Sequence, residues 1–395
     1  MTHHYKSSRL GDMSTRRTIV IGGGGIAGLA LAAALDPHRF DVTIVEPRTR
    51  LPDVATSLAM WPEAQRALDE LGVLDELAAV SPHVTRFPIR RVDGRRTVAS
   101  DVPASPLVGR RDLLIALDGA VPAGVRRVHG RIDEVDLDEL AHDTVAHGAG
   151  ARGAGADRPI VVGADGVHSA VRRQTWPEQA SAIETPFLAV RGVLPEPIDP
   201  ADMGEYWARG QLIGMGPHRD GTNWFTAFRS SLGPRHVDVA DALEEARVRV
   251  RATGGAGAAV RRVLDAATPE TTLAQRIWVT PALPTYVRDR RVLVGDAAHA
   301  MTPNLGRGGC EAIVDAVTLA RLLAEHPTET ALAEYNRARR RRTRRLARAS
   351  STVMRVATAE RAQPLRDLAL GAVSIATASS RRAASDRERS TLAAR

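Results

Sequence analysis

The chain has 395 residues, of which 44% are hydrophobic and 25% are charged, and these values are typical of a globular protein of roughly two to three domains. Its formal charge of +8 first suggests a nucleic-acid partner, but Lys6 is the only lysine and the arginine excess lies in the C-terminal third, so we expect no nucleic acid to bind. A single cysteine, Cys310, excludes an internal disulfide and a cysteine-rich metal site, and it favours a reducing, cytoplasmic location.

The N-terminal residues 1–16 are expected to form a flexible extension. They lack the apolar stretch of a signal peptide, and Met13 is an alternative to Met1 as the true start. The chain has no run of 18 or more apolar residues, so we predict no membrane span.

A strand–helix–strand unit is predicted where order begins, at Arg17. Residues 18–21 (TIVI) are apolar and are followed by glycines, which is typical of a buried parallel strand. Residues 22–35 predict a glycine turn and a helix of small residues and leucines, and residues 41–45 predict the next strand.

The glycines of this unit match the pattern G-x-G-x-x-G between a strand and a helix. Gly23 permits the tight turn, Gly25 lets the backbone approach a pyrophosphate, and Gly28 lets the helix pack closely on the strand. The helix N-terminus attracts negative charge, and Glu46 can accept hydrogen bonds from the ribose hydroxyls of adenosine. The predicted dinucleotide contacts of this unit are Gly23, Gly25, Ile26, Ala27, Gly28, Glu46 and Arg48.

Helices and short strands alternate in the next part of the chain. Residues 61–77 and 109–117 predict helices on either side of short strands at 85–102, and residues 147–157 predict a glycine-rich loop. A strand at 159–163 then leads into the segment ADGVHSAVRR.

The pattern changes at residues 183–230 to strand-like segments rich in aromatic and turn residues, which predicts a second region built on a sheet. Residues 237–266 predict a helix. A strand at 291–294 is followed by a long loop and a helix through Leu323, and residues 329–360 predict an arginine-rich helix.

The segment RVLVGDAAHAMTPNLGRGG (291–309) combines a strand, a loop fixed by Pro303 and glycines that open a helix. Asp296 at the end of the strand can hold the hydroxyls of a ribityl chain. Free N–H groups at the start of the helix stabilise the negative charge of a reduced flavin. The predicted cofactor contacts of this segment are Gly295, Asp296, Gly306, Gly308 and Gly309.

Three motifs in this order resemble the class A flavoprotein monooxygenases, the group of the p-hydroxybenzoate and salicylate hydroxylases. They are GGGGIAG with Glu46, GADGVHSAVRR and GDAAHAMTPNLGRGG, and the resemblance covers roughly residues 17–345. It implies that Asp165 and Gly166 belong to a motif that serves both FAD and NAD(P)H, that Arg110 in GRRDLL contacts FAD, and that Pro303 lies close to the reacting edge of the flavin.

The resemblance also implies a reaction. NADH or NADPH visits transiently and reduces non-covalently bound FAD. The reduced flavin takes up O2 as a C4a-hydroperoxide and hydroxylates a small aromatic or conjugated substrate. The alternatives are a dehydrogenase or reductase of the same fold and an arginine-rich nucleic-acid binder on a degenerate flavin scaffold. A halogenase is disfavoured because the chain lacks a W-x-W-x-I-P element.

The fold that this implies is α/β, with a Rossmann-like FAD-binding domain and an inserted, mainly antiparallel β-sheet substrate domain of the p-hydroxybenzoate hydroxylase type. We expect the protein to be a monomer or a homodimer without a metal site. The expected divisions are a discontinuous FAD-binding domain at 17–80, 105–175 and 285–325, a substrate domain at 81–104 and 176–284, a C-terminal helical segment at 326–375 and a disordered tail at 376–395.

Candidate catalytic residues are Pro303, Arg191 and Tyr206. Arg191 can bind a carboxylate or polarise a phenolate, or it is an ordinary surface arginine. Tyr206 or His218 can assist deprotonation of a phenol, or each has only a packing role. Trp224 and the neighbouring Phe225 are expected in the sheet core rather than against a substrate.

Other conspicuous residues allow two interpretations. Arg307 stands where many relatives carry glutamine, and it either faces an anionic flavin or substrate or turns away. His299 is expected to have a structural role, and Cys310 to be an unreactive thiol. The run at 337–345 is expected to be a solvated helix face rather than a nucleic-acid site.

Overall fold

The structure is a computed structural model that describes residues 16–52, 56–93, 96–98, 101–135, 158–233, 236–253, 257–361, 363 and 365–367. The predicted loop at 147–157, the predicted tail at 376–395 and nearly all of the predicted N-terminal extension lie outside these ranges. Within them, no helix combines the length and the apolar character needed to cross a membrane.

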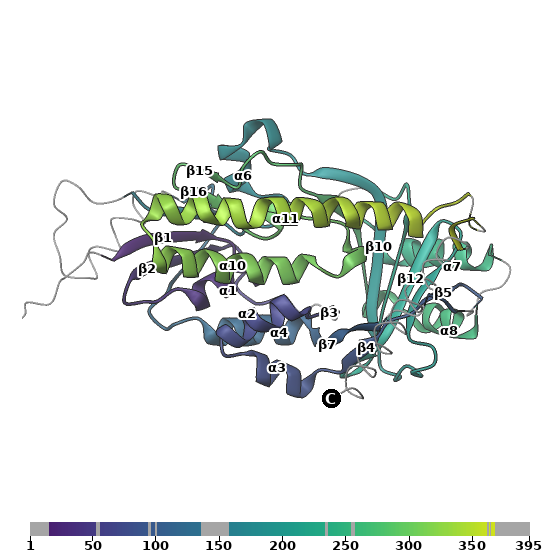
Figure 1. The fold of residues 1–395 in the computed structure, drawn as a ribbon. Coiled ribbons are helices and arrows are strands. Elements are labelled where there is room, and N and C mark those ends of the chain that lie inside the picture. Colours follow the sequence, from purple (N-terminus) through teal and green to yellow (C-terminus); the bar gives the residue numbers. More distant parts are fainter. Residues whose placement is uncertain are drawn as a thin grey trace, which may run out of the picture.

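A largely parallel sheet forms one half of the molecule (Figure 1). Its central strand, β1 (Arg17–Gly22), pairs on both sides with parallel neighbours, so that Ile19 lies opposite Val42 on one side and Ile160 on the other. Burial on both faces explains why this strand is a continuous apolar run rather than an alternating one. Its strands, in spatial order, are β15 (Val287–Arg288, antiparallel), β16 (Arg291–Leu293), β9 (Ile160–Gly163), β1 (Arg17–Gly22), β2 (Phe40–Glu46) and β8 (Arg126–His129).

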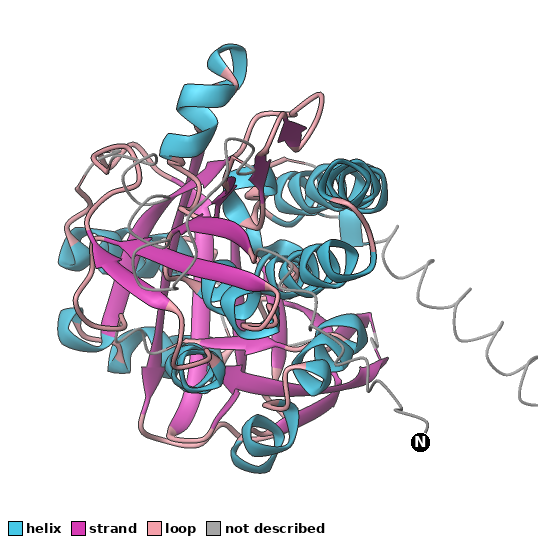
Figure 2. Cartoon of the chain, turned by 90° about the vertical axis from the view of Figure 1, so that its left-hand side faces the viewer, coloured by secondary structure: helices cyan, strands magenta, loops and turns pink. Residues whose placement is uncertain are grey.

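Helices pack around this sheet, and in Figure 2, which views the molecule from the parallel-sheet end, strands run through the centre with helices on either side. The first of them, α1, packs against both α4 and α10. The helices of this half are α1 (Ile26–Ala34), α2 (Pro62–Glu70), α3 (Leu74–Val80), α4 (Arg110–Ala120), α6 (Ala170–Thr175), α9 (Asp296–His299) and α10 (Gly308–Glu325), with short 3₁₀ turns η1 (Pro177–Gln179) and η3 (Pro303–Leu305).

A mainly antiparallel sheet forms the other half of the molecule (Figure 1). One face is covered by α7 (Val239–Arg251) and α8 (Ala258–Ala266), which share a hydrophobic cluster with it. Its strands, in spatial order, are β14 (Thr272–Val279), β10 (Ile183–Leu194), β13 (Gly221–Arg229), β12 (Gln211–His218), β11 (Gly204–Trp207), β5 (Ile89–Arg91) and β6 (Arg96–Val98), and the 3₁₀ turn η2 (Pro269–Thr271) precedes β14. The prediction of an α/β protein with a parallel sheet and a separate antiparallel sheet is confirmed.

Two predicted helices are each broken in two. The helix predicted at 61–77 ends at Glu70, because Gly72 takes a left-handed conformation with φ of 72°, and a new helix, α3, begins at Leu74. The helix predicted at 237–266 divides into α7 and α8 around a segment whose sequence contains Gly254, Gly255 and Gly257.

Two further features connect the halves. A small antiparallel sheet of β3 (Ser57–Ala59), β7 (Asp101–Gly109) and β4 (His83–Arg86) lies between them. Helix α11 (Thr328–Ala357) runs along both halves in Figure 1, and its 30 residues correspond to about 45 Å. Tyr335 donates a hydrogen bond to the Leu293 carbonyl of the parallel sheet at 3.0 Å, and Met354 packs beside Phe187 and Trp207 of the antiparallel sheet.

Candidate active site

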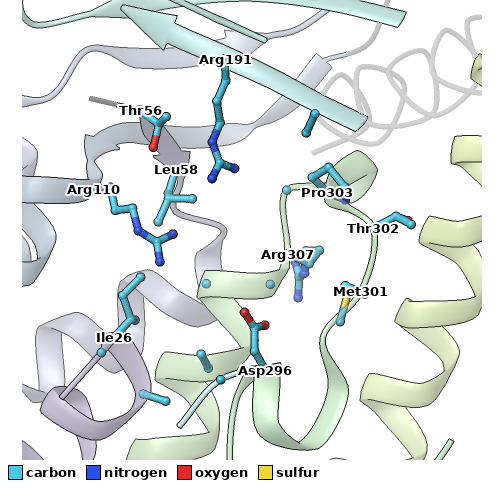
Figure 3. A pocket seen from close by; sticks show the side chains of 18 of the residues that line it. Ile26, Thr56, Leu58, Arg110, Arg191, Asp296, Met301, Thr302, Pro303 and Arg307 are labelled. Atoms are coloured by element: carbon cyan, nitrogen blue, oxygen red, sulfur yellow. The ribbon is translucent and has the colours of Figure 1, made fainter. Parts of the chain in front are cut away.

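A cavity of about 880 Å³ lies between the parallel half and the open face of the antiparallel sheet. In Figure 3, Arg191 points into it from the sheet, while Arg110 and Asp296 point into it from the other half. Most of the residues singled out from the sequence line this cavity, namely Gly23, Gly25, Ile26, Ala27, Glu46, Arg48, Arg110, Asp165, Arg191, Asp296, Pro303, Gly306, Gly308 and Gly309. Gly28, Gly295 and Tyr206 do not line it.

The turn between β1 and α1 requires glycine at positions 23 and 28, where a side chain would clash, whereas the space beside Gly25 is empty. Gly23 has φ of 106°, and a Cβ there would lie 2.5 Å from the Ala164 carbonyl oxygen. A Cβ on Gly28 would lie 1.9 Å from the Gly23 carbonyl oxygen. A Cβ on Gly25 would meet no atom within 4 Å, and no side chain of the described residues caps α1 there. The open space at an uncapped helix N-terminus fits a pyrophosphate.

Glu46 is held in its ionised form at the edge of the cavity. Its Oε2 accepts a hydrogen bond from the Gly24 backbone N–H at 2.6 Å, and its Oε1 accepts one from Nε of Arg48 at 2.7 Å. Burial raises the pKa of Glu46, but these hydrogen bonds outweigh burial and hold the pKa below its ordinary value. An ionised carboxylate here fits the ribose hydroxyls of an adenosine.

Arg110 and Asp165 both offer unsatisfied polar groups to a ligand. Among the described residues the guanidinium of Arg110 has no hydrogen-bond or ion-pair partner, and burial lowers its pKa against the raising effect of the Asp296 charge. Asp165 caps α6 through Oδ2, which accepts the Ala170 N–H at 2.7 Å. Its buried Oδ1 lacks a partner in the part of the chain that the structure describes. These groups fit the polar edges of a bound dinucleotide.

The loop from Pro303 leads directly into the N-terminus of α10. Gly306 adopts a left-handed conformation with φ of 59°, and a Cβ on Gly308 would meet no atom within 4 Å. The first turn of α10 has no side-chain cap from any described residue, so its N–H groups are available at the cavity. The positive end of this helix fits the negative charge of a reduced flavin ring.

Arg307 lines the cavity rather than turning away from it, but its charge is neutralised by carboxylates (Figure 3). Its Nη2 donates to Glu311 at 2.7 Å, its Nη1 donates to Glu63 at 3.3 Å, and its guanidinium lies 5.4 Å from the centre of the Trp61 ring. Cys310 is buried, its thiol donates to the Ala59 carbonyl, and burial raises its pKa to about 11.

Arg191 faces the cavity from β10. Its Nη2 donates to Oε1 of Gln275 at 2.8 Å, and its buried Nε has no partner among the described residues. Burial and the nearby charge of Arg110 lower the pKa of Arg191 to about 10, so it remains a cation that can meet an anionic group. This position fits a substrate-binding arginine and not a surface one.

Tyr206, a candidate catalytic residue from the sequence, lies outside the cavity, so this expectation is corrected. Its side chain lies on the opposite face of the sheet, in the cluster under α7 and α8, and its hydroxyl donates to the Asp202 carbonyl at 2.7 Å. Trp224 lies in the same cluster, as predicted, whereas Phe225 lines the cavity, contrary to the prediction. His218 does not line the cavity, and its Nδ1 accepts the Asp220 N–H.

Glu205, which precedes Tyr206 on β11, also lines the cavity and was not predicted from the sequence. Side chains of a strand alternate between faces, so Glu205 faces the cavity because Tyr206 faces the helices. Glu205 is only 9% exposed. Burial raises its pKa to about 7, against the lowering effect of the hydrogen bond from Trp207. A charged residue in an otherwise apolar strand was the available signal.

Comparisons with known proteins identify the family of the chain. The model of the FAD binding domain family matches residues 16–350. The chain is 30% identical to aurachin C monooxygenase/isomerase of Stigmatella aurantiaca over 83% of this chain and 86% of the relative. It is also 30% identical to 2-heptyl-3-hydroxy-4(1H)-quinolone synthase of Pseudomonas aeruginosa over 82% of this chain and 85% of the relative.

Solved structures share the fold. HpxO of Klebsiella pneumoniae, in complex with FAD and uric acid, aligns with a TM-score of 0.73 at 21% identity and covers 90% of this chain and 92% of its own. A salicylate hydroxylase substrate complex aligns with a TM-score of 0.70 at 22% identity, over 91% of this chain and 93% of that one. The chain therefore belongs to the FAD binding domain family and is an FAD-dependent monooxygenase of the class A flavin group, with a p-hydroxybenzoate hydroxylase-type fold.

Proposed function

We propose that the protein inserts one oxygen atom of O2 into a small aromatic or conjugated substrate at the expense of NADH or NADPH. The reaction would consume substrate, O2, NAD(P)H and a proton and would release hydroxylated product, water and NAD(P)⁺. The observation that carries this proposal is the shared cavity, which has the dinucleotide-type contacts on one wall and Arg191 with Phe225 on the other. Its volume lies within the range of ligand pockets, about 300–1,000 Å³.

On the cofactor side, Gly25 and the N-terminus of α1 would hold the pyrophosphate, Glu46 the ribose and Asp296 the ribityl hydroxyls. Arg110, whose guanidinium has no partner in the described part of the chain, would contact the cofactor as a cation. When bound, FAD supplies hydride acceptance and oxygen activation. The N-terminus of α10 and the turn at Pro303 would border its reacting ring, and α10 would stabilise negative charge there.

On the substrate side, the cavity is lined by apolar groups that would exclude water from the reacting centre. Phe225 offers a ring for stacking, and Arg191 would bind a carboxylate or polarise a phenolate-type oxygen. The apolar lining residues on this side include Val84, Phe87, Val102, Leu107, Leu212 and Phe225. We infer an electron-rich ring as substrate, and the two relatives named for quinolone or aurachin chemistry make a quinolone-like bicyclic ring a suitable first probe.

Isotopically labelled O2 tests the proposal. Purified protein loaded with FAD is mixed with NADH or NADPH and with salicylate, p-hydroxybenzoate or 4-hydroxyquinoline, and products are analysed by mass spectrometry. Label in an organic product supports oxygen insertion. If NAD(P)H oxidation proceeds while the consumed O2 is recovered entirely as hydrogen peroxide with every probe, the dehydrogenase alternative gains the support instead.

A further inference from the structure

Four strands of the antiparallel sheet place a cation, an aromatic ring and an acid in one row on the cavity face. Arg191 of β10 pairs with Phe225 of β13, Phe225 pairs with Gly214 of β12, and Gly214 pairs with Glu205 of β11. Directly paired residues share a face, so this row points as a unit into the cavity. Adjacent strands are about 4.8 Å apart, which puts about 14 Å between the backbones of Arg191 and Glu205.

The aromatic ring of the row leans toward the acid. A Cβ on Gly214 would lie 2.0 Å from Cζ of Phe225, so the ring of Phe225 occupies the space over Gly214. Gly214 has no side chain, so the cavity surface between Phe225 and Glu205 is formed by the Phe225 ring lying over the Gly214 backbone. A planar substrate that stacks on this ring would reach Glu205 with its edge.

The carboxyl group of Glu205 has one committed oxygen and one free oxygen. Oε1 accepts a hydrogen bond from Nε1 of Trp207 at 2.6 Å. Oε2 accepts none from any residue that the structure describes, although the side chain lines the cavity. A carboxyl oxygen that is left without a partner in a residue lining a ligand cavity is suited to a donor on the ligand.

The charged groups on the elements around Glu205 are engaged elsewhere. On β5, Arg91 ion-pairs with Asp367, while Arg90 lies over the Tyr206 ring on the other face. Arg366 also pairs with Asp367. The end of α11 presents Met354, and Leu212 of β12 lines the same part of the cavity. Arg191 is the remaining cation of the row, at its far end.

We propose that Glu205 is the proton acceptor of this site, and that Oε2 receives the O–H or N–H hydrogen of the bound aromatic substrate. The proton moves from the substrate heteroatom to Oε2, and the electron pair of the broken bond stays on the substrate, which makes its ring more electron-rich for oxygen insertion. This inference rests on the proposed function, because it assigns the residue that activates the substrate of that reaction.

The protonation behaviour of Glu205 matches this task. Burial raises its pKa to about 7, so the carboxylate form is available at neutral pH and the carboxylic acid is also accessible. The Trp207 hydrogen bond lowers this pKa, so its removal moves the titration to higher pH. Binding of a hydrogen-bond donor should therefore strengthen as the pH rises through about 7.

The test compares two probe ligands without turnover. The dissociation constants of 4-hydroxyquinoline, which carries a donor in either tautomer, and 1-methyl-4-quinolone, which carries none and stays neutral, are measured on the FAD-loaded protein by flavin fluorescence across pH. We expect affinity for the donor probe to increase through about pH 7 and affinity for the N-methyl probe to stay level. Glu205→Gln should remove the pH dependence and weaken the donor probe by roughly tenfold or more.

Two further variants separate proton acceptance from packing. Trp207→Phe should shift the midpoint to higher pH without abolishing it. Tyr206→Phe, next to Glu205 but on the other face, should leave the profile of the wild type unchanged. An unchanged profile in Glu205→Gln, equal pH dependence for both probes, or failure of the donor probe to bind the wild type overturns the inference. Because no turnover is measured, normal pH-dependent binding without labelled product would count only against the proposed oxygen insertion.

Discussion

Asp315 accepts hydrogen bonds from His299 and Arg339 on its two carboxylate oxygens, each at 2.6 Å. Its Oδ2 also accepts the Gly295 N–H at 2.9 Å, which fixes the backbone immediately before Asp296. Burial alone would raise the pKa of Asp315, but the charges of His299 and Arg339 lower it to about 2. A fully buried acid on α10 therefore positions the strand end that carries a cavity carboxylate.

Asp315→Asn should destabilise the protein substantially. The change leaves the Arg339 charge buried without its full complement, and breaking such a pair typically costs about 3–5 kcal/mol in the free energy of unfolding. Denaturant titration of the FAD-loaded protein measures this. Glu334→Gln, which removes the exposed ion pair with Arg337, is the control and should change stability little. Equal small losses in both variants would contradict the assignment.

The stability of the protein should fall on the alkaline side because of His299. Burial lowers the pKa of His299, but Asp315 outweighs burial and the net pKa lies above its ordinary value of 6.5. The stabilisation by protonated His299 is therefore complete below that value and is lost as pH rises through the raised pKa. Thermal melting across pH should show this loss, and His299→Gln should flatten it. His38→Gln, at an exposed histidine, should retain the wild-type profile.

Asp296→Ala should release or weaken FAD while the fold remains. The carboxylate faces the cavity at the end of β16 and would hold ribityl hydroxyls. The ratio of flavin to protein absorbance after gel filtration reports FAD content, and circular dichroism reports the fold. Asp265→Ala, at an exposed site on α8, should keep full flavin. Full flavin in Asp296→Ala would remove this residue from the site.

Arg191→Met should lower the efficiency of substrate turnover without changing cofactor binding. The side chain comes from the antiparallel sheet and points into the cavity, where its cation would meet an anionic substrate group (Figure 3). We expect a loss of roughly tenfold to a hundredfold in kcat/KM for a phenolic acid, with unchanged flavin content. Arg191→Lys retains the charge without the planar fork and should lose less. Equal kinetics in wild type and Arg191→Met would place this arginine outside the reaction.

Gly214→Ala should disturb the substrate wall through Phe225. The new Cβ would lie 2.0 Å from Cζ of Phe225, so the ring has to move into the cavity. Affinity for a planar probe should decrease by roughly tenfold while FAD remains bound. The matched control is Gly216→Ala two residues along β12, where the Cβ meets Leu107 at 3.6 Å, an ordinary contact. Similar affinities in the two variants would show that the Phe225 ring does not form the wall.

Local signals predicted many of the residues that line the cavity from the parallel half of the molecule. Gly23, Gly28 and Glu46 lie within one strand–helix–strand unit, and their requirements follow from a turn and two paired strands. The substrate side was harder, because the choice between Glu205 and Tyr206 depends on which face of β11 meets the helices. That face is set by packing of α7 and α8, which lie more than 30 residues further along the chain.

Long-range charge pairs were outside the reach of sequence analysis. Arg307 is neutralised by Glu63, which is 244 positions away, and no periodicity of the chain links the two. The breaks in the two predicted helices, by contrast, have local causes. Gly72 and the glycines near residue 255 are helix-stopping signals in the sequence, but the apolar spacing on either side of them favoured one continuous helix.

Helix α11 ties the melting behaviour of the two halves together. Tyr335 is completely buried against the parallel sheet, and Met354 is completely buried against the antiparallel one, on the same uninterrupted helix. Neither half can lose its packing without exposing part of that helix, so the chain should unfold in one cooperative transition. A ligand that binds only one half of the protein should therefore raise the melting temperature of both halves.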